Sequence, residues 1–336
     1  MIKKIGIACI TVTLLVGCTG NRSGRTGSHQ EQTEGSDRVE EAAWSMDSTS
    51  GELLLLVGTY TAKGGSEGIY LFRFNSETGE SDSLGMSEVN NPSYLTLSPD
   101  EKFVYTVSEE DGKKSAVHAF TLDKQRGRLE PLNSRPVNSR GPCYITIDSR
   151  GRHIHTANYG GGSISSLRVN EDGSLAEGTL VMSFRGSGPD PKRQESPHVH
   201  SVRYTPDGQF LFAADLGTDK LYRFEVNDTP FEGQPALQES SYSEFELPPG
   251  TGPRHFDFHP DGGRFMYLLG ELSGEVIVFD YHHGTLRQKQ VIRADSLAAR
   301  GSADIHVSPD GRFLYASNRL QGDGIAIFAV DQEEGT

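Results

Sequence analysis

The chain has 336 residues, a net charge of −14, 39 glycines and a single tryptophan. A protein this acidic repels the phosphates of DNA and RNA and the headgroups of anionic lipids, so nucleic acid is excluded as a partner. The abundant glycines and the evenly spread aromatic and β-branched residues are typical of many short strands joined by tight turns.

Residues 1–17 have the pattern of a secretion signal. Lys3 and Lys4 precede an apolar run over residues 5–16, which is too short to span a bilayer. The run ends in LVGC, which resembles a bacterial lipoprotein cleavage box, where the cysteine thiol is acylated and becomes the new N-terminus. We therefore expect Cys18 to carry lipid and to anchor the protein to a membrane of the cell envelope, on its periplasmic or surface side. An ordinary signal followed by a chance cysteine is the alternative.

Residues 18–51 are expected to form a flexible tether, because they are rich in Ser, Gly, Glu and Thr and show almost no apolar periodicity. The signal and the anchor also account for two of the three cysteines. Cys9 leaves with the signal and Cys18 carries lipid, so only Cys143 remains in the domain. A disulfide framework is thereby excluded. Cys143 is predicted to be a small core residue rather than a nucleophile.

Residues 52–336 contain an internal repeat. One recurring element is a turn related to S-P-D-G that leads into a short apolar strand; proline presets φ in such a turn and glycine closes it. The five copies begin at Ser98, Ser149, Thr205, His259 and Ser308. The second element is an alternating apolar strand ending in Asn or Asp, which recurs about every 50 residues. Its six copies are residues 69–75, 117–123, 164–170, 221–227, 276–280 and 325–331.

Each repeat unit supplies two hairpins, or four strands, and no stretch shows sustained helical periodicity. A four-stranded sheet of this size cannot bury both faces alone, whereas sheets stacked radially around a channel can. We therefore predict an all-β fold over residues 52–336, a monomeric β-propeller of four-stranded blades. A pair of β-sandwiches does not explain six equal units. The sixth unit stops after its third strand, so the chain is expected to lack most of its last blade.

Polar residues gather beside the turn–strand elements, where the channel of a propeller lies. Two pairs alternate along predicted strands, so both members of each should project to one face: His198 with His200, and Asp304 with His306. Arg254 and Glu271 flank a single turn–strand element, so both can reach the channel end of one blade. We expect these side chains to surround one cavity. Hydrogen bonding between neighbouring blades is the alternative role for each of them.

Several other chemistries find no support in the sequence. It contains no G-x-S-x-G nucleophile elbow, no Walker loop and no H-E-x-x-H motif. The glycines at 160–162 are predicted to be turn residues rather than a phosphate cradle, because no helix follows them. His198, His200 and Asp304 could ligate a metal by ligand type, but their spacing matches no specific metal signature. We therefore expect neither a metal nor a cofactor.

The segments G-P-R-H at 252–255, H-x-H at 198–200 and D-I-H at 304–306, with the S-P-D-G turns, resemble the 6-phosphogluconolactonase family of seven-bladed β-propeller lactonases, which is related to fungal carboxymuconate lactonising enzymes. The match runs from about Leu53 to residue 336, without the family's seventh blade. The resemblance implies lactone chemistry without a metal, in a pocket on one face of the channel. Its catalytic constellation would fall on His200, Arg254, Glu271 and Arg319. The surrounding substrate-binding residues would be Asn158, Tyr159, His198, His255, Asp304 and His306.

These residues suggest a mechanism for lactone hydrolysis. When water attacks the carbonyl, the oxygen gains negative charge that Arg254 and Arg319 can stabilise. The base would be His200 or a desolvated Glu271 with a pKa near neutrality. The family's nominal substrate is 6-phospho-glucono-1,5-lactone, but the expected export favours an unphosphorylated sugar lactone. A non-catalytic propeller that binds a glycan or a protein, and a lactonising cycloisomerase, are the alternatives.

Overall fold

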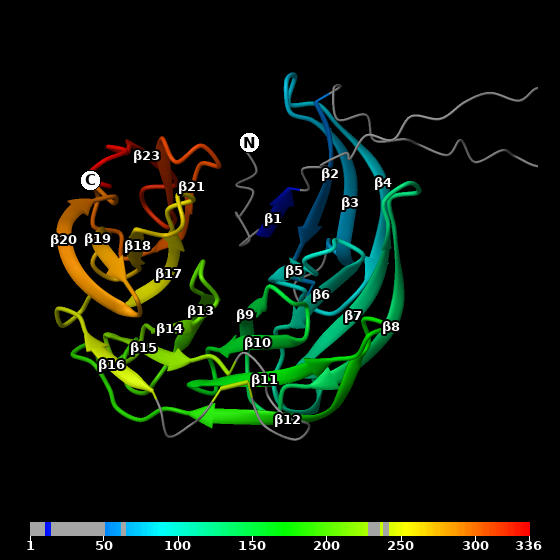
Figure 1. The fold of residues 1–336 in the computed structure, drawn as a ribbon, viewed down its shortest axis with the longest axis horizontal. Helices are drawn as coiled ribbons and strands as arrows, with labels where there is room; N and C mark the ends of the chain where they lie inside the picture. Colours follow the sequence, from blue (N-terminus) through cyan, green and yellow to red (C-terminus); the bar gives the residue numbers. More distant parts are fainter. Residues whose placement is uncertain (1–10, 15–50, 62–64, 228–235, 238–241) are drawn as a thin grey trace, which may run out of the picture.

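The computed structural model describes residues 11–14, 51–61, 65–227, 236–237 and 242–336 (Figure 1). Most of the predicted signal, the predicted lipidation site Cys18 and nearly all of the predicted tether lie outside these residues. Within the predicted signal, Thr11–Leu14 form a strand, β1, which pairs antiparallel with the first strand of the repeat. No helix in the described part of the chain is long and apolar enough to cross a bilayer.

The described residues form six antiparallel sheets. The first three are β1 (Thr11–Leu14), β2 (Glu52–Gly58), β3 (Gly68–Asn75) and β4 (Ser81–Glu88); β5 (Leu95–Leu97), β6 (Phe103–Ser108), β7 (Ala116–Asp123) and β8 (Arg128–Pro136); and β9 (Pro142–Ile147), β10 (His153–Asn158), β11 (Ser163–Val169) and β12 (Leu175–Ser183). A short 3₁₀ helix, η1 (Gly112–Lys114), joins β6 to β7.

The second half of the chain continues the pattern. Its sheets are β13 (Val199–Tyr204), β14 (Phe210–Asp215), β15 (Lys220–Glu225) and β16 (Ser243–Glu246); β17 (Pro253–Phe258), β18 (Phe265–Gly270), β19 (Glu275–His282) and β20 (Thr285–Arg293); and β21 (Ser302–Val307), β22 (Phe313–Asn318) and β23 (Gly324–Ala329). The six predicted units are all present, and the last has three strands as expected.

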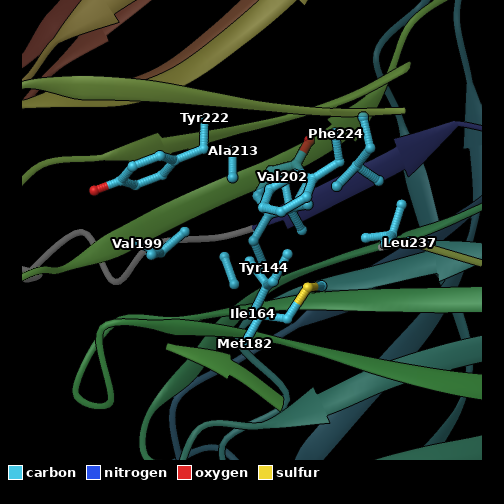
Figure 2. Close-up of a cluster of buried hydrophobic side chains, with 11 residues drawn as sticks. Tyr144, Ile164, Met182, Val199, Val202, Ala213, Tyr222, Phe224 and Leu237 are labelled. Carbon is cyan, nitrogen blue, oxygen red and sulfur yellow. The ribbon is translucent and has the colours of Figure 1, made fainter. Parts of the chain in front are cut away.

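The sheets follow one another around a common centre (Figure 1). Strands β9, β13, β17 and β21 are innermost, and β8, β12, β16 and β20 lie at the rim. Neighbouring sheets enclose separate apolar clusters. Figure 2 shows one of them, in which Tyr144 and Ile164 of the third sheet pack against Val202, Tyr222 and Phe224 of the fourth. This radial stacking confirms the predicted all-β propeller.

The S-P-D-G turns connect the first and second strands of the sheets. In the second sheet, the Ser98 hydroxyl donates to the Asp100 carboxylate at 2.7 Å and accepts the Phe103 N–H at 3.0 Å. The fourth turn residue has positive φ, +69° at Gly208 and +74° at Gly311, which glycine adopts without strain. Glu101 takes the same conformation at +55° in the second sheet. These turns fix where the second strand of each sheet begins.

Candidate active site

Four innermost strands carry a bulge at the same place. Pairing with the second strand shifts register at Cys143 in β9, at His200 in β13, at Arg254 in β17, and at Ala303 and Asp304 in β21. A bulged residue leaves the ladder, and its side chain is re-aimed. All five residues line one cavity of about 640 Å³. The bulges therefore bring side chains from four sheets to a common site.

A second set of residues reaches the cavity from the end of the second strand. The residue that follows this strand donates its N–H to a carbonyl just before the innermost strand, as Glu271 does to Gly252 at 2.8 Å and Arg319 does to Gly301 at 3.1 Å. The equivalent residues are Glu109, Tyr159 and Leu216. All except Leu216 line the cavity. Residues at one repeated backbone position thus supply charged and aromatic side chains to the wall of the cavity.

Glu271 lies at the centre of a guanidinium cluster. Its Oε2 is 2.8 Å from Arg254 Nε and 3.2 Å from Arg319 Nη2, and its Oε1 is 2.5 Å from Arg193 Nη2. Burial alone would raise the pKa of Glu271, but Arg254, Arg193 and Arg319 together hold it below its usual range. The carboxylate therefore stays ionised and lacks the near-neutral pKa that we expected of a base. Three cations around one anion give this cluster a local excess of positive charge, while Glu109 and Asp304 line other parts of the same cavity.

His200 is partly buried beside this cluster. Its Nδ1 lies 3.6 Å from the Sγ of Cys143, and its ring meets that of His255 edge-on with centroids 5.1 Å apart. Burial, followed by the charges of Arg254 and the effect of His255, holds the pKa of His200 well below its usual range. Its imidazole is therefore neutral at physiological pH.

His255 follows Arg254 along β17 and makes a hydrogen-bonding contact with a second carboxylate. Its Nδ1 lies 2.7 Å from Asp304 Oδ1, and its Nε2 lies 3.4 Å from Arg254 Nη1. The other oxygen of Asp304 is 3.1 Å from His306 Nε2. Asp304 and His306 thus meet, as their alternation along a strand predicted. His306 is half exposed and does not line the cavity.

Two expected substrate-binding residues are placed elsewhere. His198 precedes β13 instead of alternating with His200, so the two do not share a face. Its Nδ1 contacts the carbonyl oxygen of Tyr159 at 3.0 Å and its ring stacks on that of Tyr159. Asn158 is fully buried, and its amide donates to the hydroxyls of Ser163 and Ser165. Both residues support the wall behind Tyr159 rather than the cavity surface.

Several cavity residues were absent from the sequence prediction. Arg193 belongs to the loop between β12 and β13 and no motif points to it. Glu109 does carry a signal, because it occupies the same repeat position as Glu271 and Arg319. Its carboxylate accepts the hydroxyl of Tyr60 at 2.7 Å. Burial, partly offset by hydroxyl donors, raises the pKa of Glu109.

The metal alternative can be tested against this geometry. His198 turns to Tyr159, His200 lies against Cys143, and Asp304 pairs with His255. These three residues do not converge on a point. Over the part of the chain that the structure describes, no group of three His, Cys, Asp or Glu side chains is arranged to hold a metal ion.

Comparisons with known proteins agree with this architecture. A family model described as "Lactonase, 7-bladed beta-propeller" matches residues 54–336. The 6-phosphogluconolactonase of Bacillus subtilis is 39% identical over 286 residues, which cover 83% of this chain and 78% of that protein. The 6-phosphogluconolactonase of Formosa agariphila is 35% identical over 286 residues, covering 84% and 80%.

Solved structures are similar as well. A candidate 6-phosphogluconolactonase from Bacteroides fragilis superposes with a TM-score of 0.82 at 48% identity, covering 87% of this chain and 82% of that one. The periplasmic gluconolactonase of Pseudomonas aeruginosa gives a TM-score of 0.77 at 38% identity, covering 85% and 80%. The resemblance predicted from the motifs is confirmed: the chain belongs to the seven-bladed β-propeller lactonase family.

Proposed function

We propose that the protein hydrolyses a sugar lactone of the glucono-1,5-lactone type to the open hydroxy acid. The observation that carries the proposal is the cluster of Arg193, Arg254 and Arg319 around Glu271, at one side of a cavity large enough for a sugar. Membership in the lactonase family and the names of the most similar relatives support the same reaction class.

The guanidinium cluster stabilises the charge that develops during the reaction. Water attacks the lactone carbonyl and its oxygen becomes an oxyanion, which fixed cations in a dry site stabilise strongly. Arg254 is buried and held by Glu271, so it does not need to reorganise when the charge appears. Glu271 acts here by orienting the three guanidinium groups. His200 and Tyr159 close the neighbouring wall of the cavity.

Whether the substrate lactone carries a phosphate is decided by experiment. A signal peptide would export the domain away from cytoplasmic sugar phosphates and favours an unphosphorylated lactone. The three guanidinium groups gathered around Glu271 favour an anionic one. The relatives carry both names, 6-phosphogluconolactonase and periplasmic gluconolactonase.

The test is a hydrolysis screen with glucono-1,5-lactone and its 6-phosphate, read as rates above spontaneous ring opening. We expect the purified protein to accelerate at least one of them, and Arg254→Met to remove most of the acceleration. Arg287→Met is the matched control, because Arg287 is exposed and pairs with Asp280 near the rim. A rate equal to the spontaneous one with both lactones would refute the proposal and favour the non-catalytic binding role.

We further propose that residues 1–17 are removed, that Cys18 is lipidated and that residues 18–51 tether the propeller to an envelope membrane. The support is the basic–apolar–LVGC pattern of the N-terminus. Cys18→Ser should release the protein from the membrane fraction and abolish incorporation of a labelled fatty acid. Unchanged membrane association of this variant would contradict the anchor.

We also infer that a seventh sheet packs on the last described one. The family is described as seven-bladed, and Ile325 and Ile327 of β23 are 64% and 62% exposed, next to half-exposed Phe313 and Tyr315 of β22. A protein in which no further sheet covers this face should bind an apolar dye, and Ile325→Lys with Ile327→Lys should reduce the binding. A monomer that binds no dye and melts in one sharp transition would contradict the inference.

A further inference from the structure

The cavity contains a carboxylate–imidazole pair in addition to the guanidinium cluster. His255 Nδ1 lies 2.7 Å from Asp304 Oδ1, across the interface between β17 and β21. A carboxylate can only accept hydrogen bonds, so the proton of the neutral imidazole sits on Nδ1. The other nitrogen, Nε2, then carries the lone pair and accepts a long contact of 3.4 Å from Nη1 of Arg254, which an attacking water would replace. Asp304 itself is steadied by His306, whose Nε2 lies 3.1 Å from Oδ2.

Nε2 of His255 lies beside Arg254, the cation that would stabilise the oxyanion. Nε2 is 3.4 Å from Nη1 of Arg254, and the same Nη1 donates to the Ala303 carbonyl at 2.7 Å. Arg254 Nε pairs with Glu271 on its other side. Acceptor and cation therefore border the same small region of the cavity, to which both residues contribute lining atoms. A lactone whose carbonyl oxygen accepts a hydrogen bond from Arg254 would therefore have its carbonyl carbon close to His255, where an attacking water could contact Nε2.

We propose that His255 is the general base of the reaction and that Asp304 is a positioning residue that acts through it. This assignment rests on the lactone hydrolysis proposed above. The attacking water gives its proton to His255 Nε2 while its oxygen bonds to the carbonyl carbon. The oxyanion collapses, the ring C–O bond breaks, and the departing alkoxide takes the proton from the imidazolium. The sum is lactone plus water giving the hydroxy acid, with His255 returned to its starting state.

The environment of His255 keeps its imidazole neutral at physiological pH. Burial and the charge of Arg254 lower the pKa of His255 to about 4, against the opposing attraction of Asp304. The titratable or charged groups that face it are Tyr94, Tyr144, His200, Arg254, Asp304 and His306. The pKa of Glu271 is lowered as well, but the distinction is geometric: three guanidinium groups engage both oxygens of Glu271, whereas Nε2 of His255 has a single long contact with Arg254.

The experiment compares His255→Asn and Asp304→Asn with the unaltered protein on the lactone that it hydrolyses. We expect kcat to fall by about a hundredfold or more in His255→Asn and by at least about tenfold in Asp304→Asn, with KM changed less than about threefold. The pH profile of kcat/KM should lose its acid limb near pH 4 in His255→Asn. Asp304→Asn should move that limb to lower pH, because the imidazolium loses its carboxylate.

The controls separate a chemical role from a structural one. His282→Asn and Asp82→Asn change the same residue types at exposed positions on β19 and β4, and should leave the rates unchanged. Melting temperatures show whether each variant is folded. The ¹⁵N chemical shifts of His255 provide a readout without substrate, in which the unaltered protein should show the Nδ1–H tautomer.

Two results would overturn the assignment. One is a His255→Asn protein that keeps the unaltered rate within about twofold together with the acid limb. The other is an Nε2–H tautomer of His255 in the unaltered protein. Either leaves lactone hydrolysis itself standing, provided that the unaltered protein is active. An inactive unaltered protein instead contradicts the proposed function, and the tautomer measurement still decides whether Asp304 holds His255 as described.

Discussion

Two walls of the cavity carry a glutamate at the same position of the repeat, and their environments are opposite. Glu271 and Glu109 each follow the second strand of their sheet and donate their N–H to an equivalent carbonyl. Glu271 meets three guanidinium groups, and its pKa is lowered. Glu109 accepts the Tyr60 hydroxyl, and burial raises its pKa. The repeat places a carboxyl group at the cavity, and the neighbouring sheets determine whether it is stabilised as an anion.

The largest expected effect comes from removing the central cation of the arginine-rich wall. Arg254→Met should lower kcat/KM by about a hundred- to a thousandfold, because the oxyanion loses its buried, preorganised donor. Steady-state kinetics above the spontaneous background measure it. The loss should be much smaller for Arg287→Met, and equal losses in both variants would contradict the role given to this wall.

Glu271→Gln should rank second. We expect a fall of about ten- to a hundredfold in kcat/KM, because the three arginines lose the anion that orients them. The sign of the stability change follows from the lowered pKa: ionised Glu271 stabilises the fold above its unfolded pKa, and this contribution is lost as pH falls through the folded pKa. The variant should therefore melt lower than the unaltered protein at pH 7, with a smaller difference at acid pH.

Glu109→Gln should change the melting temperature at pH 7 in the direction opposite to Glu271→Gln. A raised pKa means that burial of the ionised carboxyl costs stability above the unfolded pKa, so an uncharged isostere should melt about 1–3 °C higher at pH 7. Below about pH 3 the carboxyl of Glu109 is protonated in the folded and the unfolded chain, and the difference should vanish. Because its donors are hydroxyls, kcat/KM should change less than in Glu271→Gln. If Glu109→Gln instead melts lower than the unaltered protein at pH 7, ionised Glu109 stabilises the fold as Glu271 does, and the contrast between the two walls is contradicted.

The smallest effect concerns a buried imidazole away from both walls. His155 is fully buried, its Nε2 lies 2.7 Å from the Tyr204 hydroxyl, and burial lowers its pKa to about 3. The unfolded chain binds this proton below about pH 6.5 and the folded one does not, so stability falls as pH drops from 6.5 toward 3. His155→Gln should flatten the decline in melting temperature between pH 6.5 and 5. An unchanged slope would assign the decline to other groups.

Much of the fold could be predicted from local pattern. The S-P-D-G turns and the alternating strands each depend on a few adjacent residues, and all six units appear where the repeat indicated, except that the first sheet takes one strand, β1, from the predicted signal. Of the residues carried over from the family resemblance, His200, Arg254, Glu271 and Arg319 line one cavity. Asn158, His198 and His306 do not. For His198 the reason is that the bulge in β13 depends on pairing with a second strand, which strand alternation alone cannot reveal.

The sequence by itself determined the repeat, the six sheets and the residue types that reach the channel, because turn chemistry and period-two alternation are local properties. Only the tertiary structure decided which of those residues meet. It placed Arg193, from a loop without a motif, against Glu271, and it aligned Asp304 with His255 across two sheets. It also set the opposite pKa shifts of Glu271 and Glu109, because a pKa depends on burial and on charges distant in sequence.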